Sequence, residues 1–242
     1  MLANKQFEKV LTSNYPPTKH LAGSKMINDE DRLINIREEE LLTKKTRELW
    51  DRVIVTEKVD GCNVGILKRN GKLHPIIRKG YDVRTNSMKF IQEFADFVEI
   101  NKDRFMQLLG EEERICAEWM PKTHTIRYKM KHEPFIAFDI LKTEKNKRET
   151  YLEFLRRTSA VGIVTAGLVH YGTAIETKIA LKMLGEGFHG AIDGVEGIVY
   201  RYESHIHGFL FTAKYVSNPL LGNQEIFKEN IENEKLYNKY KL

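Results

Sequence analysis

The dipeptide Asn70-Gly71 most constrains the fold of this chain, because it lies between two runs rich in apolar residues. The first run is CNVGILKR at residues 62–69, and the second is KLHPIIRKG at residues 72–80. Asn and Gly both tolerate the positive φ angles of a type I′ turn, which joins antiparallel strands. We therefore predict a β-hairpin here, preceded by a strand at RVIVTEKV, residues 52–59.

The rest of the chain alternates between strand and helix patterns. Further strands are expected at residues 114–120, 134–141, 167–172, 195–203 and 207–216. Helices are expected at residues 36–49, 87–110, 150–162, 177–187 and 224–240, and KTEKNKR at 142–148 is expected to be a solvated charged loop. Paired strands with helices outside them indicate an α+β fold.

Length and composition favour one large domain in a reducing compartment. The 242 residues are 41% hydrophobic, which is enough for a sizeable core. The net charge of +5 is compatible with a polyanionic partner. Cys62 and Cys116 both lie in apolar runs, as free thiols would. No apolar stretch is long enough to cross a membrane, and no signal peptide is evident, so we expect a cytoplasmic protein.

Lys58 ends an apolar, β-branched run and is followed by Asp60 and Gly61. A partly buried lysine whose amine loses its proton is a nucleophile, and a glycine beside it lets a ligand approach the backbone closely. A lysine that merely extends its amine to solvent before a loop would leave the same pattern. This tetrapeptide alone does not separate the two interpretations.

Five further elements follow in a fixed order: Arg78, which is 20 positions after Lys58, then Glu118, Phe138-Asp139, Glu196-Gly197 and Lys214. With Lys58, they resemble the ordered motifs of the covalent nucleotidyltransferases, which include DNA ligases, RNA ligases and mRNA capping enzymes. Within that superfamily the chain is most similar to the RNA ligases, because Asn63 follows the lysine motif and PPTKHLAGS precedes it. Only 26 residues follow Val216, too few for the OB-fold domain of DNA ligases and capping enzymes.

This resemblance implies a single nucleotidyltransferase domain over residues 1–242, made of two antiparallel sheets flanked by helices, with the nucleotide in a groove between them. Residues 1–50 would form an amino-terminal segment, 51–216 a catalytic core and 217–242 a carboxy-terminal helix. It also implies an ATP-dependent RNA ligase that seals 5′-phosphate and 3′-hydroxyl ends in RNA repair. Lys58 would carry AMP covalently before passing it to the 5′ end.

The same resemblance assigns roles to individual residues. Lys214 would hold the α-phosphate, Arg78 would contact the ribose or the incoming 5′-phosphate, and Glu118 would bind the ribose hydroxyl. Phe138 would stack on adenine, and Glu57 would border the adenine pocket through its backbone. Glu196 would bind Mg²⁺ or Mn²⁺, while Asp60 and Asn63 would serve the later steps.

Cations near the motifs are expected to contact the phosphates of RNA ends or of a nicked RNA duplex. They are Lys79, Arg84, Lys122 and Arg127, together with Arg78. Some RNA ligases carry a second lysine where this chain has Val216, and these nearby cations would compensate for it. For His124 and Tyr128, a substrate role and simple packing are both open, and a partner protein that supplies substrate binding is also open.

Two alternatives remain open at this point. One is a minimal DNA or mixed-polymer ligase, which sealing assays with RNA, DNA and mixed nicks would separate. The other is a nucleic-acid binding relative that has lost catalysis, which α-labelled ATP would distinguish by leaving the protein unlabelled.

Overall fold

Two five-stranded sheets, each with its own helices, make up the part of the chain described by the computed structural model, namely residues 8–26, 31–221 and 236–240. Each sheet belongs to one compact unit. Unit 1 comprises residues 1–16, 62–119 and 135–165, and unit 2 comprises residues 17–61, 120–134 and 166–242. The two mostly antiparallel sheets confirm the predicted α+β fold. The single domain over residues 1–242 stays a prediction.

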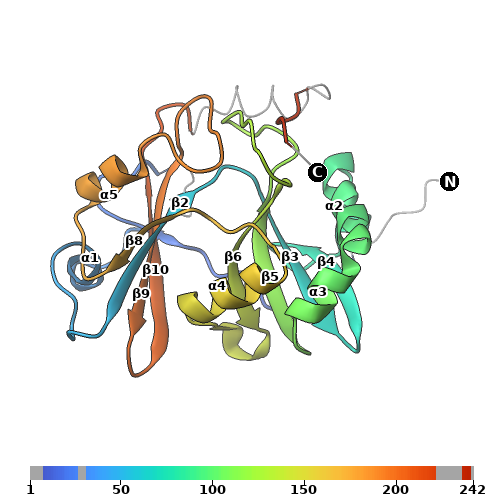
Figure 1. The fold of residues 1–242 in the computed structure, drawn as a ribbon, viewed down its shortest axis with the longest axis horizontal. Coiled ribbons are helices and arrows are strands. Elements are labelled where there is room, and N and C mark those ends of the chain that lie inside the picture. Colours follow the sequence, from blue (N-terminus) through green and yellow to red (C-terminus); the bar gives the residue numbers. More distant parts are fainter. Residues whose placement is uncertain (1–7, 27–30, 222–235, 241–242) are drawn as a thin grey trace. The chain divides into compact units, whose positions relative to one another are not determined.

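The sheet of unit 2 has the strand order β1-β10-β9-β2-β8 (Figure 1). Its strands are β1 (Lys19–His20), β2 (Arg52–Lys58), β8 (Leu168–Gly172), β9 (Gly197–Ser204) and β10 (Gly208–Val216). The pair β9 and β10 forms the predicted second hairpin, and β1 joins β10 in parallel. The interior strand β2 pairs with the central strand β9, in register from Arg52 opposite Glu203 to Lys58 opposite Gly197.

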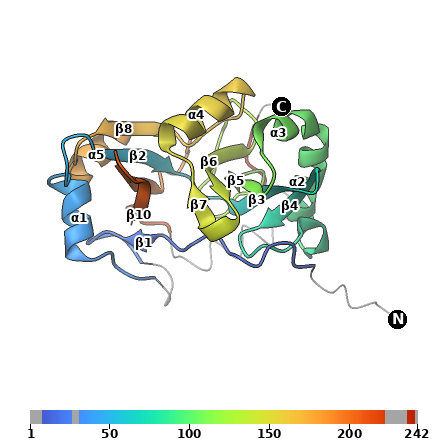
Figure 2. The ribbon, with the colours of Figure 1, turned by 90° about the horizontal axis from the view of Figure 1, so that it is seen from below.

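Two helices accompany this sheet, α1 (Ile36–Thr43) and α5 (Thr177–Leu184). In Figure 2, α1 lies beside β1. Asn35 caps α1, because its side chain accepts a hydrogen bond from Glu38 N. The helix was predicted to reach Leu49 but ends at Thr43. The last turn of the helix ends with a hydrogen bond from Lys44 N to Glu40 O. The segment after it does not continue the helix, because Arg47 N donates to Tyr202 Oη of β9 at 2.9 Å.

The sheet of unit 1 has the order β4-β3-β5-β6-β7. Its strands are β3 (Cys62–Arg69), β4 (Lys72–Ile77), β5 (Glu113–Trp119), β6 (Phe135–Lys142) and β7 (Lys147–Arg148). Asn70 and Gly71 take φ angles of 51° and 67° between β3 and β4. These positive values confirm the predicted type of hairpin turn.

Three α-helices and two 3₁₀ turns complete unit 1 within the described residues. They are η1 (Val83–Thr85), α2 (Lys89–Ile100), α3 (Lys102–Leu108), η2 (Glu144–Asn146) and α4 (Tyr151–Ala160). Figure 1 shows α2 and α3 on one side of the β3–β4 hairpin. The helix predicted over 87–110 is in fact two helices, because Asn101 leaves helical geometry and its side chain donates to Phe97 O. Rings of Phe94, Phe97 and Phe135 pack in the core below them.

Two further expectations differ from the structure. The segment 142–148 is not a solvated loop throughout: it contains η2 and β7, and the Arg148 side chain is only 5% exposed in an ion pair with Asp139. The helix expected over 224–240 falls mostly outside the described residues. Residues 236–240 are described and form isolated strand bridges at Tyr237 and Lys239 instead of a helix. Among the described residues, no helix has the length and apolar character needed to cross a bilayer.

Candidate active site

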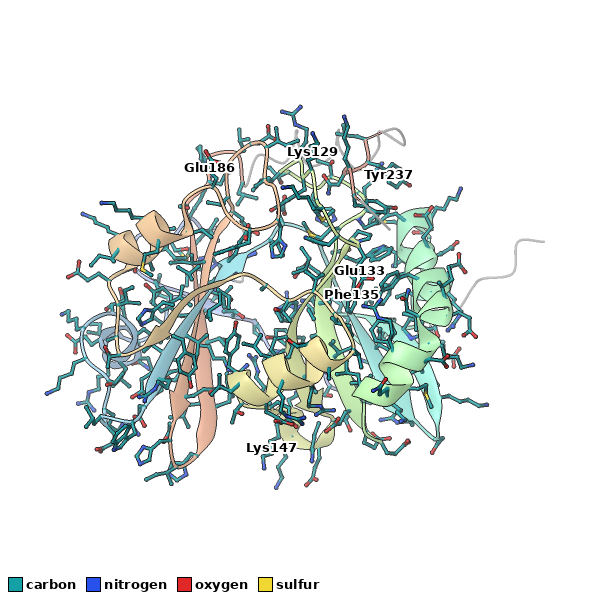
Figure 3. All side chains as sticks on the ribbon, in the orientation of Figure 1. Lys129, Glu133, Phe135, Lys147, Glu186 and Tyr237 are labelled. Atoms are coloured by element: carbon teal, nitrogen blue, oxygen red, sulfur yellow. The ribbon has the colours of Figure 1, made fainter. Side chains whose placement is uncertain are left out.

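Lys58 and Glu196 lie side by side in unit 2, where β2 ends and the adjacent strand β9 begins. Lys58 is the last residue of β2, and Glu196 directly precedes β9, so the register brings them side by side. The Lys58 Nζ atom lies 2.6 Å from Glu196 Oε1. The Lys58 side chain is 22% exposed, whereas that of Glu196 is 5% exposed. Figure 3 shows Lys129 and Glu186 on the loops at this same end of the sheet.

The Glu196 carboxyl sits in an electrostatic environment that opposes its charge. Its pKa is raised to about 7, chiefly by burial; the charges of Lys58 and Lys214 lower this pKa, and the neighbouring Asp60 carboxylate raises it. The second oxygen, Oε2, is buried and has no hydrogen-bond partner among the described residues. An uncompensated carboxylate oxygen at this depth is costly, so it is suited to a ligand that the polypeptide does not itself supply.

Lys214 reaches the same region from β10. It lies opposite Val199 of β9 and beside His20 of β1. Burial lowers the pKa of Lys214, and the nearby charge of Lys58 lowers it further. The structure thus brings three of the predicted residues, Lys58, Glu196 and Lys214, to one end of one sheet.

A carboxylate that sequence reasoning did not single out holds Lys214 in place. Asp31 Oδ1 lies 3.4 Å from Lys214 Nζ and 3.1 Å from His20 Nε2. His20 is fully buried, and its Nδ1 lies 2.6 Å from Ser24 Oγ, which in turn accepts from Val216 N. His20 and Ser24 belong to the PPTKHLAGS stretch that resembles the RNA ligases, but the resemblance assigns no role to either residue.

Asp60, predicted as catalytic, is engaged with the polypeptide backbone. Its Oδ2 accepts hydrogen bonds from Thr125 N at 2.7 Å and Ile126 N at 2.8 Å, and its own N donates to Tyr128 Oη. Tyr128 is 1% exposed, and burial raises the pKa of its hydroxyl. Burial also lowers the pKa of His124. For Tyr128 these contacts favour the packing interpretation, and for Asp60 they are those of a residue that positions the 120–134 loop.

The Glu57 side chain points into the interior of unit 2. It is 2% exposed, and its Oε2 accepts from Phe188 N at 2.7 Å. Burial raises the Glu57 pKa to about 7. Gly187 makes this approach possible, because it has a φ of +80° and a Cβ there would lie 2.5 Å from Glu57 Oε1.

Glu118, predicted to bind the nucleotide, and Asn63, predicted to serve the later steps, lie together in unit 1. Asn63 of β3 is directly opposite Glu118 of β5, and Asn63 Nδ2 donates to Glu118 Oε1 at 3.4 Å. Both side chains are partly exposed. The pair therefore leaves a carboxylate and an amide on one face of the sheet, as a ligand with hydroxyl groups would require.

Phe138 owes its orientation to a β-bulge. Cys116 faces Asp139 and Ala117 faces Ala137, so Phe138 is the additional residue of β6. Its partly buried ring meets Tyr15 edge to face, with centroids 5.4 Å apart. A bulge redirects a side chain that regular alternation would bury, and no periodicity in the sequence indicates it.

The cations expected to contact phosphates have different surroundings. The side chains of Arg78, Lys79 and Arg84 are exposed, although Arg84 Nη1 lies 3.1 Å from Asp82 Oδ2. Arg127 is also exposed and binds Asp193 with two of its nitrogens. Lys122, in contrast, is 3% exposed, and its Nζ lies 5.3 Å from the ring centroid of Tyr237, a residue labelled in Figure 3.

A divalent cation at this site would share its coordination with a ligand. Among the described residues, no cluster of three or more His, Cys, Asp or Glu side chains could enclose a metal. The unpartnered Oε2 of Glu196 offers one hard oxygen ligand. Mg²⁺ commonly binds one or two carboxylates together with phosphate oxygens of a substrate, so the residues present fit that mode of binding.

Comparison with protein families finds a match between residues 51–216 and the RNA ligase family. Comparison with curated proteins finds no match to this sequence.

Solved structures of ligases resemble the fold. An archaeal ATP-dependent RNA ligase has a TM-score of 0.52 and 18% identity, with 84% of this chain and 48% of that chain covered. A mutant of Naegleria gruberi RNA ligase with ATP and Mn has a TM-score of 0.56 and 14% identity, covering 93% of this chain and 63% of that one. The same enzyme with PPi has a TM-score of 0.54 and 13% identity. This chain thus spans less than two thirds of either ligase, and the likeness concerns the fold.

Proposed function

The chain belongs to the RNA ligase family, and we propose that it is an ATP-dependent RNA ligase that joins a 5′-phosphate end to a 3′-hydroxyl end. One observation carries this proposal: the Lys58 amine is held 2.6 Å from the buried Glu196, with the cation of Lys214 on the neighbouring hairpin. Nucleophilic attack on a phosphorus atom requires three groups: a nucleophile, a hard oxygen ligand for a metal ion, and a second cation near the phosphate.

In the first step, the Lys58 nitrogen forms a bond to the α-phosphorus of ATP, and the bond from that phosphorus to pyrophosphate breaks. The amine must first lose a proton, because an ammonium ion has no free electron pair. Water would take this proton, because the Lys58 side chain is partly exposed. The positive charge of Lys214 favours the neutral amine, since two nearby cations repel each other.

In the second step, an oxygen of the RNA 5′-phosphate attacks the phosphorus of the lysyl-AMP, and the Lys58 nitrogen leaves. In the third step, the 3′-hydroxyl attacks the adenylated 5′ end, AMP leaves, and the phosphodiester closes. In both steps an attacking oxygen must approach a phosphorus atom surrounded by negatively charged oxygens, which repel it. Lys214 and Arg78 would reduce that repulsion, and Asp60 would act by keeping the 120–134 loop in position.

Nucleotide recognition is assigned to residues of the sequence motifs. Glu118 would accept a hydrogen bond from a ribose hydroxyl, Phe138 would stack on the adenine ring, and Asn63 would orient Glu118. Glu57 would act indirectly, by fixing the end of β2 beside Lys58. Mg²⁺ or Mn²⁺ at Glu196 Oε2 would add positive charge beside the phosphates. The fold relative with bound ATP and Mn supports this choice of ligands.

The test is transfer of label from α-labelled ATP to the protein, followed by strand joining. Wild type with Mg²⁺ should become labelled and should seal RNA nicks. Lys58→Arg keeps the charge and should be unlabelled, since an arginine side chain does not lose its proton. A panel of RNA, DNA and mixed nicks then defines the polymer. Sealing of DNA alone would contradict the proposal, as would a wild-type protein that takes up no label.

A further inference from the structure

A basic hollow lies beside α1 in unit 2. It has a volume of about 560 Å³ and opens beside the carboxy-terminal half of α1. Its lining residues are Arg37, Glu40, Leu41, Lys44, Lys45 and Arg47. We call this the α1 hollow. Four of the six side chains are cationic and only one is acidic, so the hollow attracts anions.

The charges of the α1 hollow are largely uncompensated within the described residues. Glu40 Oε1 lies 3.0 Å from Lys44 Nζ, which neutralises both groups. Arg37, Lys45 and Arg47 have exposed side chains, and no ion pair with a described carboxylate is formed by any of them. Exposed cations that converge on a concavity can bind several phosphate oxygens without first breaking internal ion pairs.

An exposed aromatic side chain follows these cations in the sequence. Trp50 follows Arg47 in the turn that leads into β2, and it is 63% exposed. The Arg52 guanidinium lies 5.9 Å from the centre of its ring. A large ring left in water with a cation over it presents a π-face, on which a nucleobase of any sequence can stack.

The α1 hollow is separate from the nucleotide chemistry of unit 2. Arg52 and Lys58 lie at opposite ends of β2, and six strand steps correspond to about 20 Å. The elements that form it are well anchored: Asn35 caps α1, Leu42 is fully buried, and Arg47 N donates to Tyr202 Oη. The cations are therefore presented by a fixed scaffold, and their side chains can be removed without disturbing it.

We propose that the α1 hollow and Trp50 bind the backbone of single-stranded RNA, at a distance from the strand end that reacts. This proposal rests on the proposed function, because the choice of RNA as the ligand follows from it. A membrane surface fits less well, because the cations converge in a concavity. The planar arginine donors would bind phosphate groups, and the exposed aromatic ring would stack on a base, so the two together fit a nucleic acid. The binding is expected to be independent of sequence.

The test compares two double variants of the full chain that remove equal charge from unit 2. Lys45→Ala with Arg47→Ala removes cations of the α1 hollow, while Lys178→Ala with Lys182→Ala removes exposed cations of α5. Binding of a labelled single-stranded RNA is measured by anisotropy between about 50 and about 200 mM salt. Loss of two phosphate contacts should weaken binding about 10-fold or more and reduce the salt slope by about 1.4. The α5 variant should bind as wild type does.

Trp50→Ala provides an independent measurement. It should weaken RNA binding by about fivefold or more, while Trp50→Phe retains most of the affinity. Unchanged affinity in both Trp50→Ala and the α1 double variant would overturn the proposal. An equal loss in the α5 variant would also overturn it, as would equal competition by polyglutamate.

Labelling of Lys58 by ATP is measured in the same preparations. If wild type takes up no label but its RNA binding depends on the α1 hollow, the proposed function fails and this inference stands. If labelling is normal and the variants bind RNA normally, the inference fails and the proposed function stands.

Discussion

At the residue scale, the position of Lys214 depends on the Asp31 carboxylate, to which the sequence motifs assign no role. Asp31 is shared between the Lys214 ammonium and the buried His20. His20 is in turn held by Ser24, whose hydroxyl also binds the backbone of Val216 two residues after the lysine. Asp31, His20 and Ser24 therefore act as one support for Lys214, and weakening it should affect the lysine without unfolding the strand.

Asp31→Asn should slow adenylylation by about tenfold, which corresponds to about 1.4 kcal/mol. The amide keeps the size of the side chain but leaves Lys214 without its charged partner. Rapid-quench measurement of label transfer from ATP gives the rate. Lys214→Ala should be much slower than Asp31→Asn, and Ser24→Ala should fall between Asp31→Asn and wild type. Equal rates for Asp31→Asn and wild type would show that Lys214 is positioned by other contacts.

Glu57 gives a prediction of pH-dependent stability. Burial raises its pKa from 4.5 to about 7, so folding favours the protonated carboxyl. Its nearest titratable neighbour, His189, has its Nε2 3.9 Å from Glu57 Oε2. Burial and the charge of His132 lower the His189 pKa to about 4, so this ring offers Glu57 no positive charge at neutral pH.

The contribution of Glu57 to stability is therefore full below pH 4.5 and is lost as the pH rises through about 7. In Glu57→Gln this loss, roughly 3 kcal/mol, should disappear. Urea unfolding at several pH values measures the difference between variant and wild type. Asp51→Asn is the control of opposite sign: burial opposes ionisation of Asp51, but hydrogen bonds from Tyr202 and His205 outweigh it and lower the pKa. That variant should lose stability above pH 3.8 and match wild type in acid.

At the element scale, the Asp60 side chain, two residues after β2, is one of the groups that hold the 120–134 loop. Asp60 accepts from two consecutive loop amides, and Tyr128 Oη accepts from Asp60 N. Removing the carboxylate leaves two buried donors without an acceptor, which is costly in a folded protein.

Asp60→Ala should lower the free energy of unfolding by about 2–4 kcal/mol. Tyr128→Phe removes one hydroxyl and should cost about 1 kcal/mol. Chemical denaturation compares the two variants with wild type. An Asp60→Ala protein of wild-type stability that has lost ligation would instead indicate that the carboxylate acts directly in the chemistry.

Local sequence patterns account for most elements of both sheets. The Asn70-Gly71 turn and the β9–β10 hairpin follow from short-range preferences, and the structure confirms them. The patterns do not show where α1 ends, because that depends on a hydrogen bond to Tyr202 from a distant strand. The bulge at Phe138 likewise depends on pairing with β5, which no local preference encodes.

At the scale of the whole molecule, the candidate site is assembled from distant segments. Lys58 and Glu196 are separated by 138 positions in the chain, and only the β2–β9 register explains their contact. The ordered motifs could identify Lys58, Glu196 and Lys214, since they carry the family resemblance. The support by Asp31 and the α1 hollow could not be identified in this way, because each depends on packing between segments.

The most direct test of the account is peptide mapping by mass spectrometry after incubation of the wild-type protein with ATP and Mg²⁺. The account predicts the mass of one AMP on the peptide that contains Lys58, removable by pyrophosphate and absent in Lys58→Arg. Glu196→Gln should carry much less of it, because that variant loses both the partner of Lys58 and the oxygen available to a metal. AMP attached to another residue, or none on folded wild-type protein, would contradict the account.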